Sequence, residues 1–164
     1  MTTRDDYTDE EWTYLTAAPI MAGMYVSAVA SSEPIDTTKK AVALAHAVGE
    51  LMHRGSANEL IGTLIDEINR KEVEAVQTRT AIAIGAKTPD ALQAKTLHAL
   101  QQAAAVLSKA KREEAAEYKA LVMSLSQRVA QMKEGGFLGL GGTPVSEGDV
   151  RAIQEIGVAL NTTA

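Results

Sequence analysis

Apolar residues recur along this chain at helical spacing, and turn-forming residues divide the pattern into segments. Thr8 introduces the first segment: its side chain can cap a helix, while Glu11 can reach back to the Thr8 backbone. From Ala17 to Ala30 the chain is apolar on nearly every side, which predicts a central buried helix. Pro19 either ends or kinks the short helix that follows Thr8, or it starts the next helix as a first-turn proline.

The middle of the chain predicts further helices. Asp36 caps one that Gly55 ends. Ser56 or Asn58 starts another, and the segment 72–84 is also interpreted as helix. The helix that follows Asn58 has an apolar stripe made of Leu60, Ile61, Leu64, Ile65 and Ile68.

A long helical pattern follows Thr88, which caps it, and Pro89, which occupies its first turn. No further glycine or proline occurs before Gly135. A single helix here would far exceed the mean length of about 11–12 residues, so we predict a break near Ser108–Arg112. The two parts have apolar stripes made of Leu92, Leu97, Leu100, Ala104 and Leu107, and of Ala115, Tyr118, Leu121, Val122, Leu125, Val129 and Met132.

Ser146 caps the last predicted helix, which has apolar positions at Val150, Ile153, Ile156 and Leu160. Val145 and Val150 flank this cap as a hydrophobic staple. Together these patterns predict an all-α fold: one domain over residues 1–164, built as a bundle of about six to eight helices. Two stacked helical hairpins are one arrangement that fits.

The segment Gly135–Gly142 interrupts the pattern with glycines and large apolar residues. It lacks the lysine of a P-loop, and a helix rather than a strand precedes it, so neither phosphate-binding motif fits. Its residues Phe137, Leu138 and Leu140 either fold back onto the bundle or contact a protein partner or a second copy of the chain.

Two turns share a pattern in which proline, an apolar residue and a capping residue precede a helix: Pro34-Ile35-Asp36 and Pro144-Val145-Ser146. The hairpins around them resemble those of the bacterial TerB-like helical domains associated with tellurite resistance. This resemblance covers the two ends of the chain and implies a metal-binding acidic turn. The first turn offers Glu33 and Asp36, whereas residues 141–144 have no acid.

Candidate metal ligands lie in the segment "HAVGELMH". His46, Glu50 and His53 share one helix face, and Glu50 and His53 have the spacing that di-iron bundles use. Such bundles need a second pair, which this chain lacks. A single metal ion would require His98 or Asp66 from another helix. The alternative is that Glu50 hydrogen-bonds one histidine at the rim of the core.

Other chemistry has little support in the sequence. There is no nucleophile elbow, and Tyr14 and Tyr25 have no evident partner. The adjacent acids Asp66-Glu67 and Glu113-Glu114 are expected to be solvated, because neighbours on a helix point about 100° apart.

Composition narrows the function further. The chain has no cysteine, which fits the cytoplasm, and its net charge of -5 disfavours nucleic acid. No segment reaches the roughly 20 apolar residues of a membrane span. We therefore predict a non-enzymatic, cofactor-free interaction or scaffold protein that can self-associate. The alternative is a TerB-like domain that binds a metal or a small ligand.

Overall fold

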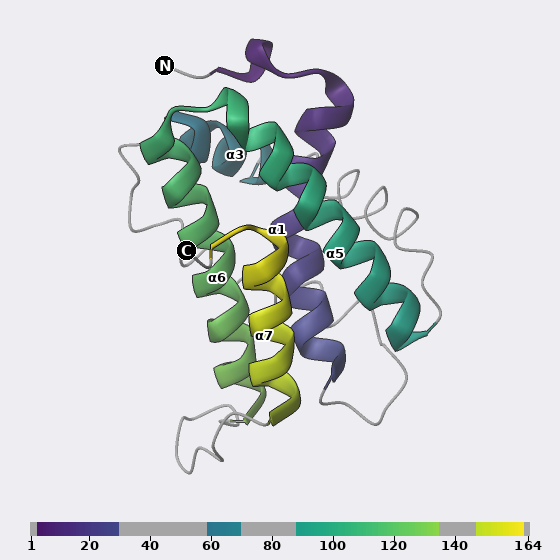
Figure 1. The fold of residues 1–164 in the computed structure, drawn as a ribbon. Helices are drawn as coiled ribbons and strands as arrows, with labels where there is room; N and C mark the ends of the chain where they lie inside the picture. Colours follow the sequence, from purple (N-terminus) through teal and green to yellow (C-terminus); the bar gives the residue numbers. More distant parts are fainter. Residues whose placement is uncertain (1–2, 30–58, 70–87, 135–146, 163–164) are drawn as a thin grey trace.

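The computed structural model describes residues 3–29, 59–69, 88–134 and 147–162. Every regular element in these ranges is a helix, which confirms the predicted all-α class (Figure 1). The predicted total of six to eight helices also involves segments outside them. The elements are two short 3-10 helices, η1 (Arg4–Asp6) and η2 (Leu107–Lys109), and the α-helices α1 (Asp9–Val29), α3 (Glu59–Asn69), α5 (Pro89–Val106), α6 (Arg112–Glu134) and α7 (Glu147–Ala159).

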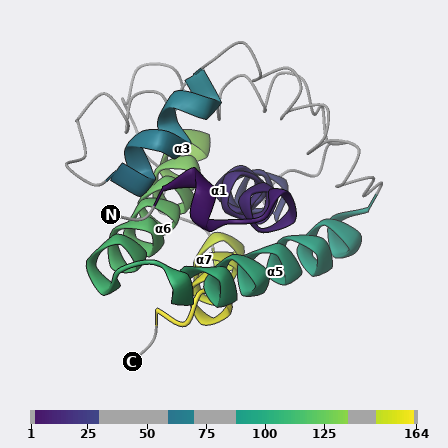
Figure 2. The same cartoon turned by 90° about the horizontal axis from the view of Figure 1, so that it is seen from above.

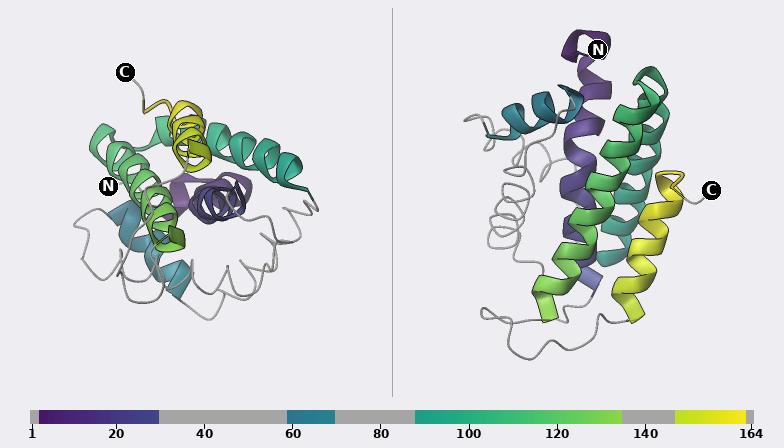
Figure 3. Two further views of the ribbon diagram at one scale, coloured as in Figure 1. Left: turned by 90° about the horizontal axis from the view of Figure 1, so that it is seen from below. Right: turned by 90° about the vertical axis from the view of Figure 1, so that its left-hand side faces the viewer.

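Helix α1 lies at the centre of the described part of the bundle. It packs against α3, α5, α6 and α7, and Figure 2 shows it nearly end-on among them. Helices α6 and α7 run alongside α1, whereas α3 lies across it (Figure 3). Between Leu15 and Val26, side chains around most of the circumference of α1 are therefore buried, among them Leu15 and Ala18 at 0% exposure, Met21 at 4% and Thr16 at 6%. This confirms the predicted central helix over its described residues.

The predicted caps of α1 and α5 are present. The Glu11 backbone N–H donates to Thr8 Oγ1 at 3.2 Å, and the Thr8 N–H donates to the Glu11 carboxylate at 2.8 Å. This reciprocal pair satisfies two N–H groups that have no partner within the helix. In α5, Thr88 Oγ1 accepts from the Ala91 N–H at 3.2 Å, and Pro89 occupies the first turn. Both helices thus begin where these capping residues place them.

Pro19 neither ends a helix nor starts one, so two of the three roles predicted for it are wrong; the predicted kink remains a prediction. Helix α1 continues through Pro19 from Asp9 to Val29. An internal proline leaves the carbonyl four residues earlier without its helical N–H donor. Here the Tyr118 hydroxyl on α6 donates to the Leu15 carbonyl at 2.7 Å. A contact from another helix therefore satisfies the backbone group that the proline leaves open.

The break predicted near Ser108–Arg112 is confirmed. Helix α5 ends at Val106, the 3-10 turn η2 follows, and α6 begins at Arg112. Tertiary contacts also follow the predicted stripes on both sides of this break. Leu92, Leu100 and Leu107 are buried before it, as are Tyr118, Val122 and Leu125 after it.

The apolar face predicted for α7 is correct at Ile156 and Leu160, which are both 0% exposed, and wrong at Val150, which is 45% exposed. The buried face also contains Asp149 and Ala152. Val150 lies about 100° around the helix from Asp149 and 200° from Ala152, so its side chain points away from the core. In α3, Leu60, Ile61 and Leu64 of the predicted stripe are buried.

The carboxyl end of α7 is closed by a Schellman motif. Asn161 has a φ of 53°, in the left-handed region. The Asn161 N–H donates to the Val158 carbonyl at 3.0 Å, and the Thr162 N–H donates to the Gly157 carbonyl at 2.9 Å. Lys119 on α6 then donates to the Asn161 carbonyl at 3.3 Å. The end of α7 is therefore capped locally and also tied to α6.

No helix in the described ranges combines the length and the apolar character that crossing a bilayer requires. The helices predicted over residues 36–54 and 72–84, and the caps assigned to Asp36 and Ser146, lie outside the described residues.

Candidate functional site

The candidate residues named from the sequence lie outside the part of the chain that the structure describes. These are the proposed metal ligands His46, Glu50 and His53, and the proposed contact residues Phe137, Leu138 and Leu140. The two extra ligands considered for the metal are described. His98 is exposed on α5 and Asp66 is exposed on α3. Within the described ranges, no three His, Cys, Asp or Glu side chains are grouped so that they could hold a metal ion.

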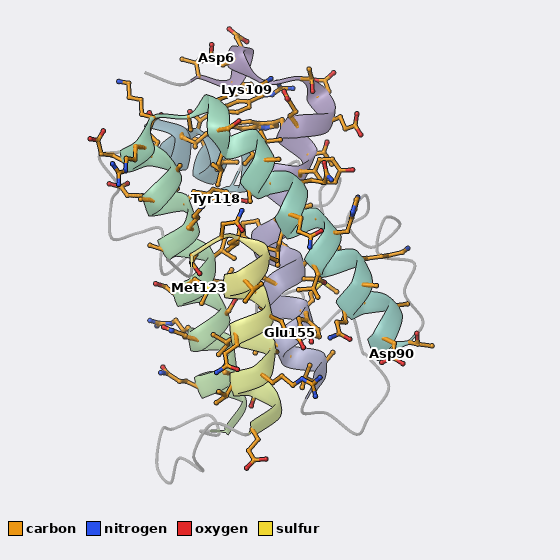
Figure 4. All side chains as sticks on the ribbon, in the orientation of Figure 1. Asp6, Asp90, Lys109, Tyr118, Met123 and Glu155 are labelled. Atoms are coloured by element: carbon orange, nitrogen blue, oxygen red, sulfur yellow. The ribbon has the colours of Figure 1, made fainter. Side chains whose placement is uncertain are left out.

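The main polar cluster among the described residues joins α1, α5 and α7. Glu155 on α7 is at its centre, labelled in Figure 4 beside the lower part of α1. The Tyr25 hydroxyl and the Gln93 amide each donate to Glu155 Oε2 at 2.7 Å. Arg151 Nε donates to Glu155 Oε1 at 3.3 Å. We call these four residues the Glu155 cluster.

Each helix contributes to this cluster for a local reason. Arg151 and Glu155 are four residues apart on α7, so their side chains lie on the same face. Tyr25 lies near the end of α1, and Gln93 lies in the first turns of α5. Their side chains meet at Glu155 because α5 and α7 both pack against α1 and against each other.

Electrostatics in the cluster follow from these contacts. The hydrogen bond from Tyr25, assisted by those from Gln93 and Arg151, lowers the pKa of Glu155 below its ordinary value of 4.5. Burial, together with the hydrogen bond to the carboxylate, raises the pKa of Tyr25. At neutral pH, Glu155 is therefore charged and Tyr25 is protonated. The lowered pKa makes Glu155 a weaker base, and its hydrogen bonds instead join three helices.

The expectation that Tyr14 and Tyr25 have no partner is wrong. The Tyr14 ring meets the His98 ring edge-on, with centroids 6.3 Å apart, and Tyr25 bonds Glu155. A tyrosine in an apolar segment does signal that its hydroxyl needs a partner. The sequence could not identify that partner, because Tyr25 and Glu155 are 130 positions apart.

A second cluster covers the upper end of α1. The Tyr7 and Trp12 rings lie 5.8 Å apart, and the Arg4 guanidinium lies 5.3 Å from the centre of the Trp12 ring. Arg4 also bonds Asp9. Lys109, at the end of η2, forms an ion pair with Glu11 at 2.7 Å. These contacts attach the amino-terminal segment to α1 and to the turn between α5 and α6.

Glu114 is not solvated as predicted, because it is only 8% exposed. Its carboxylate accepts the Lys111 N–H at 3.1 Å and so caps the start of α6. Burial, followed by the charges of Glu114, Asp6 and Glu11, raises the pKa of Tyr7 to about 12. The buried Tyr7 hydroxyl is the one side-chain polar atom among the described residues that is enclosed without a hydrogen-bond partner.

These features define an all-α bundle whose described polar clusters join helices to one another. In the comparisons with known proteins, no family model, no curated protein and no solved structure matches the chain. The resemblance to TerB-like domains stays a hypothesis from the sequence.

Proposed function

We propose that this protein is a non-enzymatic helical interaction or scaffold protein that associates with itself. The observation that supports this proposal is the exposure of large apolar side chains at one end of the bundle. Val29, at the end of α1, is 37% exposed, and Val150, in the first turn of α7, is 45% exposed.

The Glu155 cluster places these two valines at the same level of the bundle. Tyr25 and Glu155 are in contact, and α1 and α7 run in opposite directions (Figure 1). Val29 lies four residues beyond Tyr25, about 6 Å along α1, and Val150 lies five residues before Glu155, about 7.5 Å along α7. Both displacements lead toward the same end of the molecule.

The glycine-rich segment lies in the sequence between two helix termini at this end of the bundle. Helix α6 ends at Glu134 and α7 begins at Glu147, and both termini lie at the end of the bundle where α1 ends (Figure 1). Phe137, Leu138 and Leu140 lie in the sequence between them. Together with Val29 and Val150 they supply the apolar residues of the proposed contact surface.

Sedimentation velocity over a wide range of protein concentrations tests this proposal. We expect the mean mass to rise with concentration, and we expect Val150→Glu to abolish that rise. Val158→Glu is the matched control: Val158 is 61% exposed on the same helix but lies about 12 Å further along it. A protein that stays monomeric at every concentration contradicts self-association. Equal effects of the two variants contradict the assigned surface.

Phe137→Ala tests the part played by the glycine-rich segment. If Phe137 contacts a second copy, the substitution shifts the mass toward monomer, and the loss is greatest at low protein concentration. If Phe137 instead packs within its own bundle, the melting temperature falls at every concentration. Unchanged mass and unchanged melting would remove Phe137 from the proposal.

The alternative proposal, a metal- or ligand-binding domain of the TerB-like kind, depends on His46, Glu50 and His53. Elemental analysis of the purified protein tests it. Stoichiometric zinc or iron that is lost in both His46→Ala and His53→Ala would favour this alternative over the scaffold role.

A further inference from the structure

Helix α1 contains an internal backbone carbonyl that its own helix leaves without a donor. The Leu15 carbonyl would normally accept the N–H of residue 19, and residue 19 is proline. Pro19 and Leu15 are both buried, so water does not replace the missing donor freely. An unsatisfied buried carbonyl is costly, and this position therefore requires a donor from outside α1.

Tyr118 of α6 supplies that donor. Its side chain is 0% exposed, and its hydroxyl lies 2.7 Å from the Leu15 carbonyl oxygen. Figure 4 shows Tyr118 on the inner side of α6. Burial raises the pKa of Tyr118, so the hydroxyl keeps its proton and remains a donor over the whole range of ordinary pH.

The apolar surface of α1 defines the position of α6 along it less sharply than the Tyr118–Leu15 hydrogen bond does. Many of its buried side chains are small, including Ala17, Ala18, Ala22 and Ala28. Small side chains form a smooth surface, and apolar burial has no preferred direction, whereas a hydrogen bond requires its donor and acceptor to lie about 3 Å apart with the correct alignment. A slip of one helical turn, about 5.4 Å, would separate the Tyr118 hydroxyl from the Leu15 carbonyl and leave this buried carbonyl without its donor.

We propose that Pro19 and Tyr118 form a register lock, a paired device that fixes the position of α6 along α1. Pro19 creates an open acceptor inside α1, and Tyr118 is the donor that fits it. Carbonyls elsewhere in α1 already accept their own helical N–H groups and gain less from a second donor: the Thr96 hydroxyl of α5 reaches the Met21 carbonyl only at 3.5 Å. The short Tyr118 bond therefore favours the register that places this hydroxyl at the Leu15 carbonyl. Conformational specificity from a buried polar group is known in other helical assemblies.

A double-mutant cycle on the full chain tests the pairing. Tyr118→Phe removes only the hydroxyl, and it should lower the folding equilibrium constant by roughly five- to 150-fold. Pro19→Ala restores an N–H donor for the Leu15 carbonyl. In the Pro19→Ala background, Tyr118→Phe should therefore change the logarithm of the folding equilibrium constant by less than half as much as it does in the wild-type chain. Tyr25→Phe is the matched control, because its hydroxyl bonds Glu155 rather than a carbonyl of α1. Its effect should be equal in both backgrounds.

Register itself requires a distance measurement. The chain has no cysteine, so spin labels can be attached at Thr13→Cys on α1 and Gln127→Cys on α6, both of which are exposed. We expect a single narrow distance distribution with Tyr118 present. Tyr118→Phe should broaden this distribution or add a second distance shifted by up to about 5 Å, the rise of one helical turn.

Two results would overturn the lock. An equal cost of Tyr118→Phe in both backgrounds would show that the proline and the tyrosine are independent. An unchanged distance distribution would show that the hydrogen bond adds stability without selecting a register. If Tyr118→Phe alone is too unstable to measure, the comparison is the gain from Pro19→Ala, since alanine also stabilises a helix interior by itself. A larger gain in the Tyr118→Phe chain than in the wild-type chain supports the lock, and an equal gain contradicts it.

Discussion

Tyrosine hydroxyls join α1 to α6 and α1 to α7, but the two contacts differ in chemistry. Tyr118 is enclosed completely and bonds a neutral carbonyl of Leu15. Tyr25 bonds the carboxylate of Glu155, whose side chain is 25% exposed. The first contact has no charge that acid or salt can change, whereas the second depends on a charge that both can reach. The central helix α1 is therefore held by two kinds of hydrogen bond. The Tyr118–Leu15 bond is insensitive to pH and salt, whereas the Tyr25–Glu155 bond responds to both.

The largest effect on stability should come from breaking the Tyr118–Leu15 hydrogen bond. Tyr118→Phe is expected to lower the free energy of unfolding by about 1–3 kcal/mol, because the Leu15 carbonyl is left buried without a donor. This loss should be the same at pH 4 and pH 7, and in low and high salt, since neither partner is charged. Urea titrations followed by circular dichroism measure it. A loss that varied strongly with salt would contradict the comparison.

A smaller and pH-dependent effect on stability is expected at the Tyr25–Glu155 contact. Glu155→Gln should cost about 1–2 kcal/mol at pH 7, because it removes the charge that strengthens three hydrogen bonds. The pKa of Glu155 is lowered in the folded protein, so its contribution is present above the ordinary value of 4.5. The contribution is lost as the pH falls through the lowered pKa.

The measurement is a pair of unfolding curves, for wild type and Glu155→Gln, taken from pH 7 downward. The difference in free energy between them should narrow as acid protonates Glu155. If the difference in free energy of unfolding stayed constant to the acid end of the range, the charge of Glu155 would contribute nothing to this contact.

The carboxyl end of α7 tests whether its attachment is also local. Asn161→Ala should cost about 1 kcal/mol, because the left-handed conformation at a φ of 53° penalises a Cβ that has no polar group. Asn161→Gly is the control and should leave stability equal or slightly higher. Thermal melts of both variants distinguish two causes. Backbone strain lowers the melting temperature of the alanine variant alone, whereas a lost side-chain contact lowers that of the glycine variant as much.

The smallest effect is expected at the rim of the Glu155 cluster. Arg151 is 81% exposed and lies 3.3 Å from Glu155. Arg151→Ala should therefore cost only about 0.2–0.5 kcal/mol, and the cost should disappear at high salt. Unfolding measured in low and high salt checks this. A cost as large as that of Glu155→Gln would place the strength of the cluster in the ion pair rather than in Tyr25 and Gln93.

Local patterns determined much of the fold. Thr8 and Thr88 cap helices as predicted, and the chain breaks between α5 and α6 near Ser108–Arg112. These features depend on residues three or four positions apart, whose relative positions a helix fixes by itself. The candidate metal ligands at positions 46–53 and the contact residues at positions 137–140 remain predictions from the sequence, since they lie outside the described ranges.

By itself, the sequence determined the helical class, the central apolar helix and, within the described ranges, most of the helix boundaries, because hydrophobic spacing and capping act over a few residues. Only the tertiary structure decided that α1 continues through Pro19, that Glu114 is buried and that Val150 is exposed. It also paired Tyr118 with Leu15, 103 positions away, and Tyr25 with Glu155. Such pairings depend on how helices dock against one another. Helix periodicity within a segment identifies the buried face of that helix but not the distant residue that will contact it.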